Sequence, residues 1–166
     1  MTAVQRGRFT VAGDRDVVVF LIGMRINTLR RVRAWAPVVA AMPRMLAELA
    51  KDPDAGMLSA RSFVSGRTVL VRQYWQDTEH LLAYASASDS QHLPAWRAFN
   101  RAARSTDGAV GIFHETYRVP AGSMEAVAVD MPESGVLEAL GSVPVTRARS
   151  SARERFAGTG APVTPS

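Results

Sequence analysis

Residues 17–24 have the sequence VVVFLIGM, an uninterrupted run of eight apolar residues. A run of this length is typical of a β-strand that is buried on both faces. It is too short to cross a bilayer as a helix, and it lies too far from the start of the chain for a typical secretion signal. We therefore expect a central strand here, from residue 16 to about residue 26, in a cytoplasmic protein with no membrane partner.

The next segments predict a helix and a hairpin. Residues 32–51 carry apolar side chains at three- and four-residue steps, which predicts a helix that Pro43 should kink or split. Residues 57–65 and 67–75 are rich in β-branched and aromatic side chains and are separated by Gly66. This pattern predicts a β-hairpin.

The second half of the chain repeats the helix–strand order. Asp77 can cap a helix that reaches about residue 84, and a second helix is expected from about residue 89 to residue 105. Residues 108–119 alternate as a strand, and residues 124–131 can add a short one. The order βαββαβ predicts an α+β fold of the ferredoxin-like type, with one antiparallel sheet and helices on one face.

Both faces of the strand at residues 67–75 carry apolar or aromatic side chains. Helices would cover one face, so the other needs a second cover, and we expect a homodimer in which a second copy supplies it. The expected domain spans residues 15–143. Residues 1–14 are expected to form a loosely attached arm, and residues 144–166, rich in Arg, Ser, Gly and Pro, a disordered basic tail.

Composition excludes several classes of site. The chain of 166 residues has no cysteine, which rules out disulfides, cysteine zinc sites, iron–sulfur clusters and thiol nucleophiles. Its 20 basic residues outnumber 15 acidic ones, but the excess is concentrated in residues 25–33 and 147–155. A nucleic-acid partner would favour a spread surface of basic and aromatic residues, so we expect no specific nucleic-acid binding.

No phosphate-binding loop, dinucleotide-binding turn or hydrolase motif is present. Polar residues inside apolar elements are the remaining candidates. Arg25 and Asn27 end the central strand, where they can clamp an anion or a carbonyl group; alternatively, Asn27 makes a turn and Arg25 an ion pair at the rim.

The three histidines do not have the spacing of a metal site, so we expect no metal ligand apart from a haem ligand. His92, Trp96 and Phe99 share one helical face, which suits a general base, an axial haem ligand or a buried structural histidine. His114 alternates onto the strand face opposite Glu115, so the two cannot act as a dyad.

The chain resembles a family of small fungal and bacterial proteins related to the fumagillin-pathway monooxygenase, within the dimeric α/β-barrel superfamily. The matching segments are FLIGMRIN (20–27), WAPVVAAMPRMLAEL (35–49), GRTVLVRQYW (66–75), HLPAWRAFN (92–100), VGIFHETYRVPAGSMEAV (110–127) and DMP (130–132). The resemblance implies a homodimer of ferredoxin-like subunits, each with a small-molecule cavity between its sheet and its helices.

The superfamily includes cofactor-independent oxidases of electron-rich substrates and haem proteins. On the oxidase hypothesis, His92 or His114 is the base and Arg25 steadies an anionic intermediate, with Asn27 beside it. Aromatic residues would then line the cavity: Trp35, Tyr74, Trp75, Trp96 and Phe99. On the haem hypothesis His92 is the axial ligand. A third hypothesis is a non-catalytic small-molecule binder.

Overall fold

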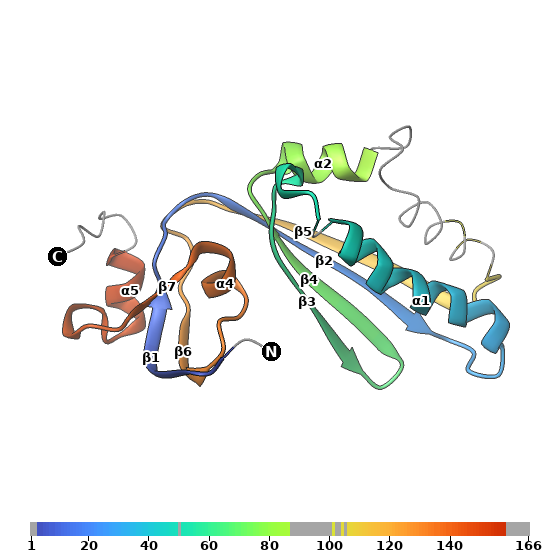
Figure 1. Cartoon of the computed structure of the whole chain (residues 1–166), viewed down its shortest axis with the longest axis horizontal. Helices are drawn as coiled ribbons and strands as arrows, with labels where there is room; N and C mark the ends of the chain where they lie inside the picture. Colours follow the sequence, from blue (N-terminus) through green and yellow to red (C-terminus); the bar gives the residue numbers. More distant parts are fainter. Residues whose placement is uncertain (1–2, 50, 87–100, 102–103, 105, 159–166) are drawn as a thin grey trace.

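The computed structural model describes residues 3–49, 51–86, 101, 104 and 106–158. Its larger sheet has four antiparallel strands in the order β3-β4-β2-β5. Their bounds are β2 (Val17–Ile26), β3 (Met57–Ser65), β4 (Thr68–Trp75) and β5 (Val110–Val119). The apolar run at residues 17–24 forms the interior strand β2, flanked by β4 and β5 (Figure 1). The order confirms the predicted ferredoxin-like α+β sheet.

Helices α1 (Val32–Leu49) and α2 (Thr78–Ser86) lie on one side of this sheet (Figure 1). A short 3₁₀ turn, η1 (Pro53–Ala55), leads into β3. The sequence predicts that Pro43 kinks or splits the first helix, and the split is wrong, because α1 continues through both Pro37 and Pro43; a kink stays a prediction. Packing explains this result: Val38 in the same helix is fully buried, and tertiary burial stabilises a helix more than one lost hydrogen bond destabilises it.

The predicted cap of α2 is confirmed. The carboxylate of Asp77 accepts a hydrogen bond from the backbone N–H of His80 at 2.8 Å. Most of the second predicted helix, residues 89–105, lies outside the described residues.

The core lies between the sheet and the helices. Antiparallel partners point to the same side of a sheet, so the pairs Val18–Trp75 and Ile22–Val71 place four buried side chains on the face that α1 and α2 cover. The opposite face, called the open face here, bears apolar and aromatic side chains that include Val19, Leu21, Phe63, Leu70, Tyr74, Phe113 and Tyr117. Phe63, Phe113 and Tyr117 are each at least 41% exposed, which is unusual for large rings on one sheet.

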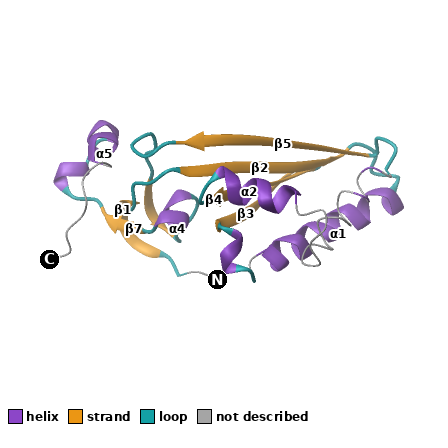
Figure 2. Cartoon of the chain, turned by 90° about the horizontal axis from the view of Figure 1, so that it is seen from above, coloured by secondary structure: helices purple, strands orange, loops and turns teal. Residues whose placement is uncertain are grey.

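The two ends of the chain meet in a second sheet with the order β6-β1-β7. Its strands are β1 (Gln5–Val11), β6 (Val127–Met131) and β7 (Ser142–Pro144); α4 (Val136–Leu140), η2 (Arg147–Arg149) and α5 (Ala152–Gly158) accompany them. Figure 2 shows this group beside one end of the large sheet.

The second sheet corrects two expectations. Residues 5–11 form a paired strand rather than a loose arm, and residues 144–158 form regular elements rather than a disordered tail. The physical reason is pairing between distant segments: Arg155 is buried against Glu125, and the Arg8 guanidinium donates to the carbonyl of Ser150 at 3.0 Å. Residues 159–166 of the predicted tail lie outside the described residues, and the boundary proposed for the domain stays a prediction.

Candidate functional site

His114 lies on β5, on the face of the sheet that carries the helices. It pairs across the strands with Ile22, its side chain is exposed, and its ring lies 5.8 Å from the ring of Phe20. In the described part of the chain His114 has no carboxylate within ion-pair distance. A solvent-reachable imidazole beside an apolar ring can act as a general base toward a bound molecule.

Arg25 and Asn27 do not form a common clamp with His114. Arg25 points to the open face, because its neighbour Met24 is part of the core, and its side chain is exposed. The side-chain amide of Asn27 donates to the carbonyl of Gly108 at 3.0 Å, and its backbone N–H donates to Ala109. Asn27 thus joins the end of β2 to the turn before β5. The anion clamp predicted for Arg25 and Asn27 stays a prediction.

Tyr74 and Trp75 point to opposite faces of β4. Trp75 is fully buried, its indole N–H donates to the Gln73 side chain at 2.9 Å, and its ring lies 5.3 Å from that of Tyr84. Trp75 is therefore a core residue in this structure. Tyr74 lies on the open face, next to Arg72.

Trp35 is half-buried at the start of α1, and its indole N–H donates to the carbonyl of Leu29 at 3.0 Å. This bond ties the helix to the loop after β2. His92, Trp96 and Phe99 lie outside the described residues, so the roles predicted for them, including haem ligation by His92, stay predictions. The described residues hold no group of three or more His, Cys, Asp or Glu side chains able to bind a metal ion.

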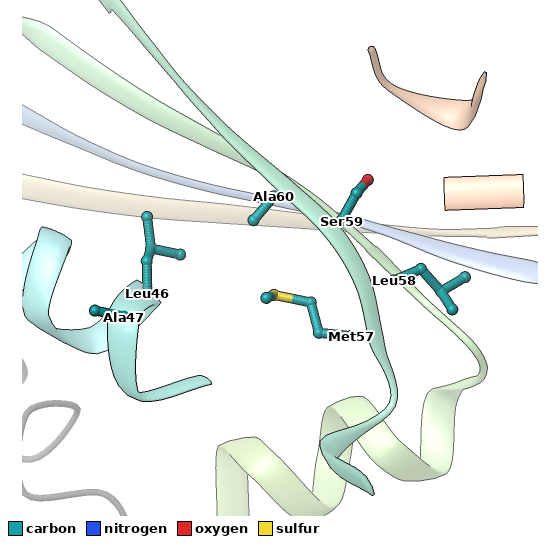
Figure 3. Close-up of a pocket in the computed structure, with 6 residues that line it drawn as sticks. All are labelled: Leu46, Ala47, Met57, Leu58, Ser59 and Ala60. Atoms are coloured by element: carbon teal, nitrogen blue, oxygen red, sulfur yellow. The ribbon is translucent and has the colours of Figure 1, made fainter. Parts of the chain in front are cut away.

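A cavity of about 440 Å³ lies between the end of α1 and the start of β3 (Figure 3). Its lining contains one hydroxyl group and no titratable side chain: Leu46, Ala47, Met57, Leu58, Ser59 and Ala60. It lies beside the place where the register of β3 shifts between Met57 and Ser59. Sequence reasoning missed this cavity, because the shift depends on pairing with β4.

The cavity and His114 are separate places. β3 and β5 are the two edges of the sheet, three strand spacings or about 14 Å apart, with the packed core between them. One small molecule cannot contact both.

Among the described residues, the pKa values of Asp77, Tyr117 and Glu154 are shifted. The backbone N–H of His80 and then its side chain lower the pKa of Asp77, and the N–H and hydroxyl of Ser151 lower that of Glu154. The hydrogen bond from the Tyr117 hydroxyl to Glu115 raises the pKa of Tyr117. Tyr117 and Glu115 lie on the open face, so this pair is away from His114.

None of the helices in the described ranges combines the length and the apolar character that a membrane crossing requires.

Among known proteins, the chain is 26% identical over 157 residues to monooxygenase af470 of Aspergillus fumigatus. That alignment covers 89% of this chain but 54% of the relative, so the chain spans about half the length of this curated protein.

Two solved structures are distantly similar. SnoaB, a cofactor-independent oxygenase from Streptomyces nogalater, has a TM-score of 0.43 at 15% identity, covering 61% of this chain and 91% of SnoaB. MupZ from Pseudomonas fluorescens has a TM-score of 0.41 at 19% identity, covering 60% and 69%. Neither likeness is close enough to carry an argument about function.

The model of one protein family matches residues 17–136, from the first residue of β2 to the first residue of α4. This match covers most of the chain and the whole four-stranded sheet. The chain therefore belongs to the monooxygenase af470-like family.

Proposed function

We propose that this protein is a small-molecule monooxygenase that oxidises an electron-rich organic substrate without a cofactor. The observation that carries the proposal is the family match over residues 17–136. The substrate would lie on the helix-covered side of the sheet, with His114 as the base. The exposed imidazole of His114 and the neighbouring ring of Phe20 support this location.

The reaction balances with dioxygen as the oxidant. His114 takes a proton from an activated CH₂ group of the substrate, and the resulting carbanion passes one electron to dioxygen. The two radicals combine into a peroxide anion, which takes a proton back from His114. Loss of water then leaves a carbonyl group, so one oxygen atom enters the product and the other leaves as water.

Oxygen uptake with anthrone, whose enol form is electron-rich, tests this proposal in buffer with EDTA and without added flavin or haem. We expect wild-type uptake and a fall of roughly 100-fold or more in kcat/KM for His114→Gln, the size expected for loss of a general base. His80→Gln is the matched control. His80 is also partly exposed, but it lies on α2, away from His114, and is hydrogen-bonded to Asp77.

Equal uptake by wild type and His114→Gln would overturn the role of His114. One equivalent of hemin tests the haem alternative: a sharp Soret band that elutes with the protein would contradict the cofactor-free proposal.

A non-catalytic small-molecule binder is the second candidate. The cavity between α1 and β3 favours it, because its volume lies in the range of ligand pockets and its lining offers no titratable group for catalysis. If apolar small molecules stabilise the protein against unfolding and none of them causes oxygen uptake, the binder is favoured over the oxygenase.

We also propose that the protein is a homodimer in the cytoplasm, as the sequence predicts. The exposed rings of Phe63, Phe113 and Tyr117 on the open face support the homodimer. A second copy with the same face would bury them.

A further inference from the structure

The face of β5 that carries His114 changes in character along the strand. In chain order its side chains run from apolar to charged: Val110, Ile112, His114, Thr116 and Arg118. Each of them pairs with an apolar residue of β2, in the same order Ile26, Met24, Ile22, Phe20 and Val18. Because antiparallel partners share a face, a row of polar groups lies beside a row of apolar ones on this side of the sheet.

This side of β5 is not covered by α1 or α2. Figure 2 shows both helices on the β3 side of β2, with β5 clear of them. Ile112 is 39% exposed, and the side chains of His114, Thr116 and Arg118 are exposed as well. A flat molecule therefore has room to lie along β5, with the ring of Phe20 beside the imidazole of His114.

Arg118 is the charged end of this row. Its cross-strand partner, Val18, belongs to the core, whereas the Arg118 side chain is exposed. Its guanidinium makes no ion pair with any carboxylate in the described part of the chain. The planar fork of the guanidinium is thus available to a carboxylate that a ligand brings.

The spacing along β5 sets the length of the ligand. His114 and Arg118 lie on one face of the same strand, with their Cα atoms about 13 Å apart at the rise of an extended chain. The long arginine side chain can lean along the strand and shorten this gap. A fused-ring molecule spans the remaining distance between an imidazole and a guanidinium.

We propose that Arg118 binds a carboxylate of the substrate while His114 faces the CH₂ group that reacts. This inference rests on the proposed oxygenase function and adds the substrate class, a flat, enolisable molecule with a carboxylate at its far end. Thr116 lies between the two, and its hydroxyl can donate to a carbonyl group of the same molecule.

Titration calorimetry tests the carboxylate preference without turnover. The probe is anthraquinone-2-carboxylate, which has no CH₂ group to oxidise, and its neutral counterpart is anthraquinone-2-carboxamide. We expect the wild type to bind the carboxylate roughly tenfold more tightly than the amide, because hydrogen bonds between two charged groups are the stronger ones. Arg118→Gln should lose this preference, and Arg118→Lys, which keeps the charge but not the fork, should retain part of it.

Arg153→Gln is the matched control. It removes the same charge from an exposed arginine of α5, so it should bind both probes as the wild type does. A similar loss of preference in Arg153→Gln would mean that net charge alone attracts the carboxylate, and would overturn the role of Arg118.

Oxygen uptake separates this inference from the oxygenase function, with anthrone-2-carboxylate and anthrone as the two substrates. Arg118→Gln should lower kcat/KM for the carboxylate about tenfold, mainly through KM, and leave kcat/KM for anthrone unchanged, since it removes a binding contact far from the reacting carbon. His114→Gln should lower kcat for both substrates.

The outcomes can be told apart. Equal affinity of wild type and Arg118→Gln for the carboxylate probe would overturn the role of Arg118, even if both proteins oxidise anthrone. Loss of the preference in Arg118→Gln, with no oxygen uptake by the wild type from either substrate, would support the carboxylate site and contradict the oxygenase function. Circular dichroism checks that each variant is folded, and Arg118→Lys takes the place of Arg118→Gln if the latter is not.

Discussion

Gln73, Tyr74 and Trp75 are neighbours in the chain but occupy two different environments. Gln73 and Trp75 are bonded to each other in the core, whereas Tyr74 lies on the open face with Arg72. The alternation of side chains along a strand follows from the sequence. Because of this alternation, Tyr74 and Trp75 do not line the same cavity. Which of the two residues is buried depends on where the helices pack.

Trp75→Phe should reduce stability without changing catalysis. The substitution leaves the buried Gln73 carbonyl without its donor, which costs about 1–3 kcal/mol, while the core keeps an aromatic ring. We expect a lower urea midpoint and a kcat/KM for anthrone within about twofold of wild type, since no step of the proposed reaction uses a donor at this position.

Trp35→Phe is the control for this prediction. The indole N–H of Trp35 donates to the Leu29 carbonyl near the surface, so loss of this hydrogen bond should destabilise the protein less. A Trp75→Phe protein with unchanged stability and lost activity would instead make Trp75 a cavity residue.

Sequence patterns that act over a few residues, such as helix caps, predicted the helices and strands of the large sheet well. The carboxylate of Asp77 bonds the first turn of α2, as the sequence predicts for a helix cap. Pro43 shows the limit of a local signal. Its ring should interrupt a helix, yet α1 is continuous because its buried face is held against the sheet.

The cap of α2 should make stability depend on acid pH. The pKa of Asp77 is lower in the folded chain than its usual 3.8, because its carboxylate accepts hydrogen bonds from His80. The stabilisation is therefore full above about pH 4 and is lost as the pH falls through the folded pKa. Urea unfolding should show Asp77→Ala less stable than wild type at pH 7, with the difference shrinking below pH 4.

Asp54→Ala is the control for the cap, because Asp54 is an exposed carboxylate outside α2. A difference between wild type and Asp77→Ala that stays constant from pH 7 to pH 3 would contradict this account.

On the scale of the whole molecule, one face of the large sheet is covered by helices and the other is partly covered by the turn before α4. The contacts of Arg61 and Ser59 with residues 133–138 hold this turn against β3. The rest of the open face keeps its large rings exposed. A second copy of the chain remains the expected cover.

Phe113→Asp should dissociate the homodimer. Its ring lies over Gly23 near the middle of the open face, and burial of an unpaired carboxylate in an interface costs several kcal/mol. Light scattering after gel filtration should give a dimer mass for the wild type and a monomer mass for Phe113→Asp. Val64→Asp, at a position 75% exposed on the other face of β3, should stay dimeric. A wild-type protein of monomer mass would rule out the homodimer.

By itself, the sequence determined the βαββαβ order, the hairpin and the cap of α2, because periodicity and turn chemistry act between residues close in the chain. The tertiary structure alone decided the second sheet, since Gln5 pairs with Met131 across more than 100 residues. It also decided that Trp75 is core and that Arg72 lies under Gly135. These outcomes depend on which distant surfaces meet, and burial and pairing between distant segments leave no periodic signal in the sequence.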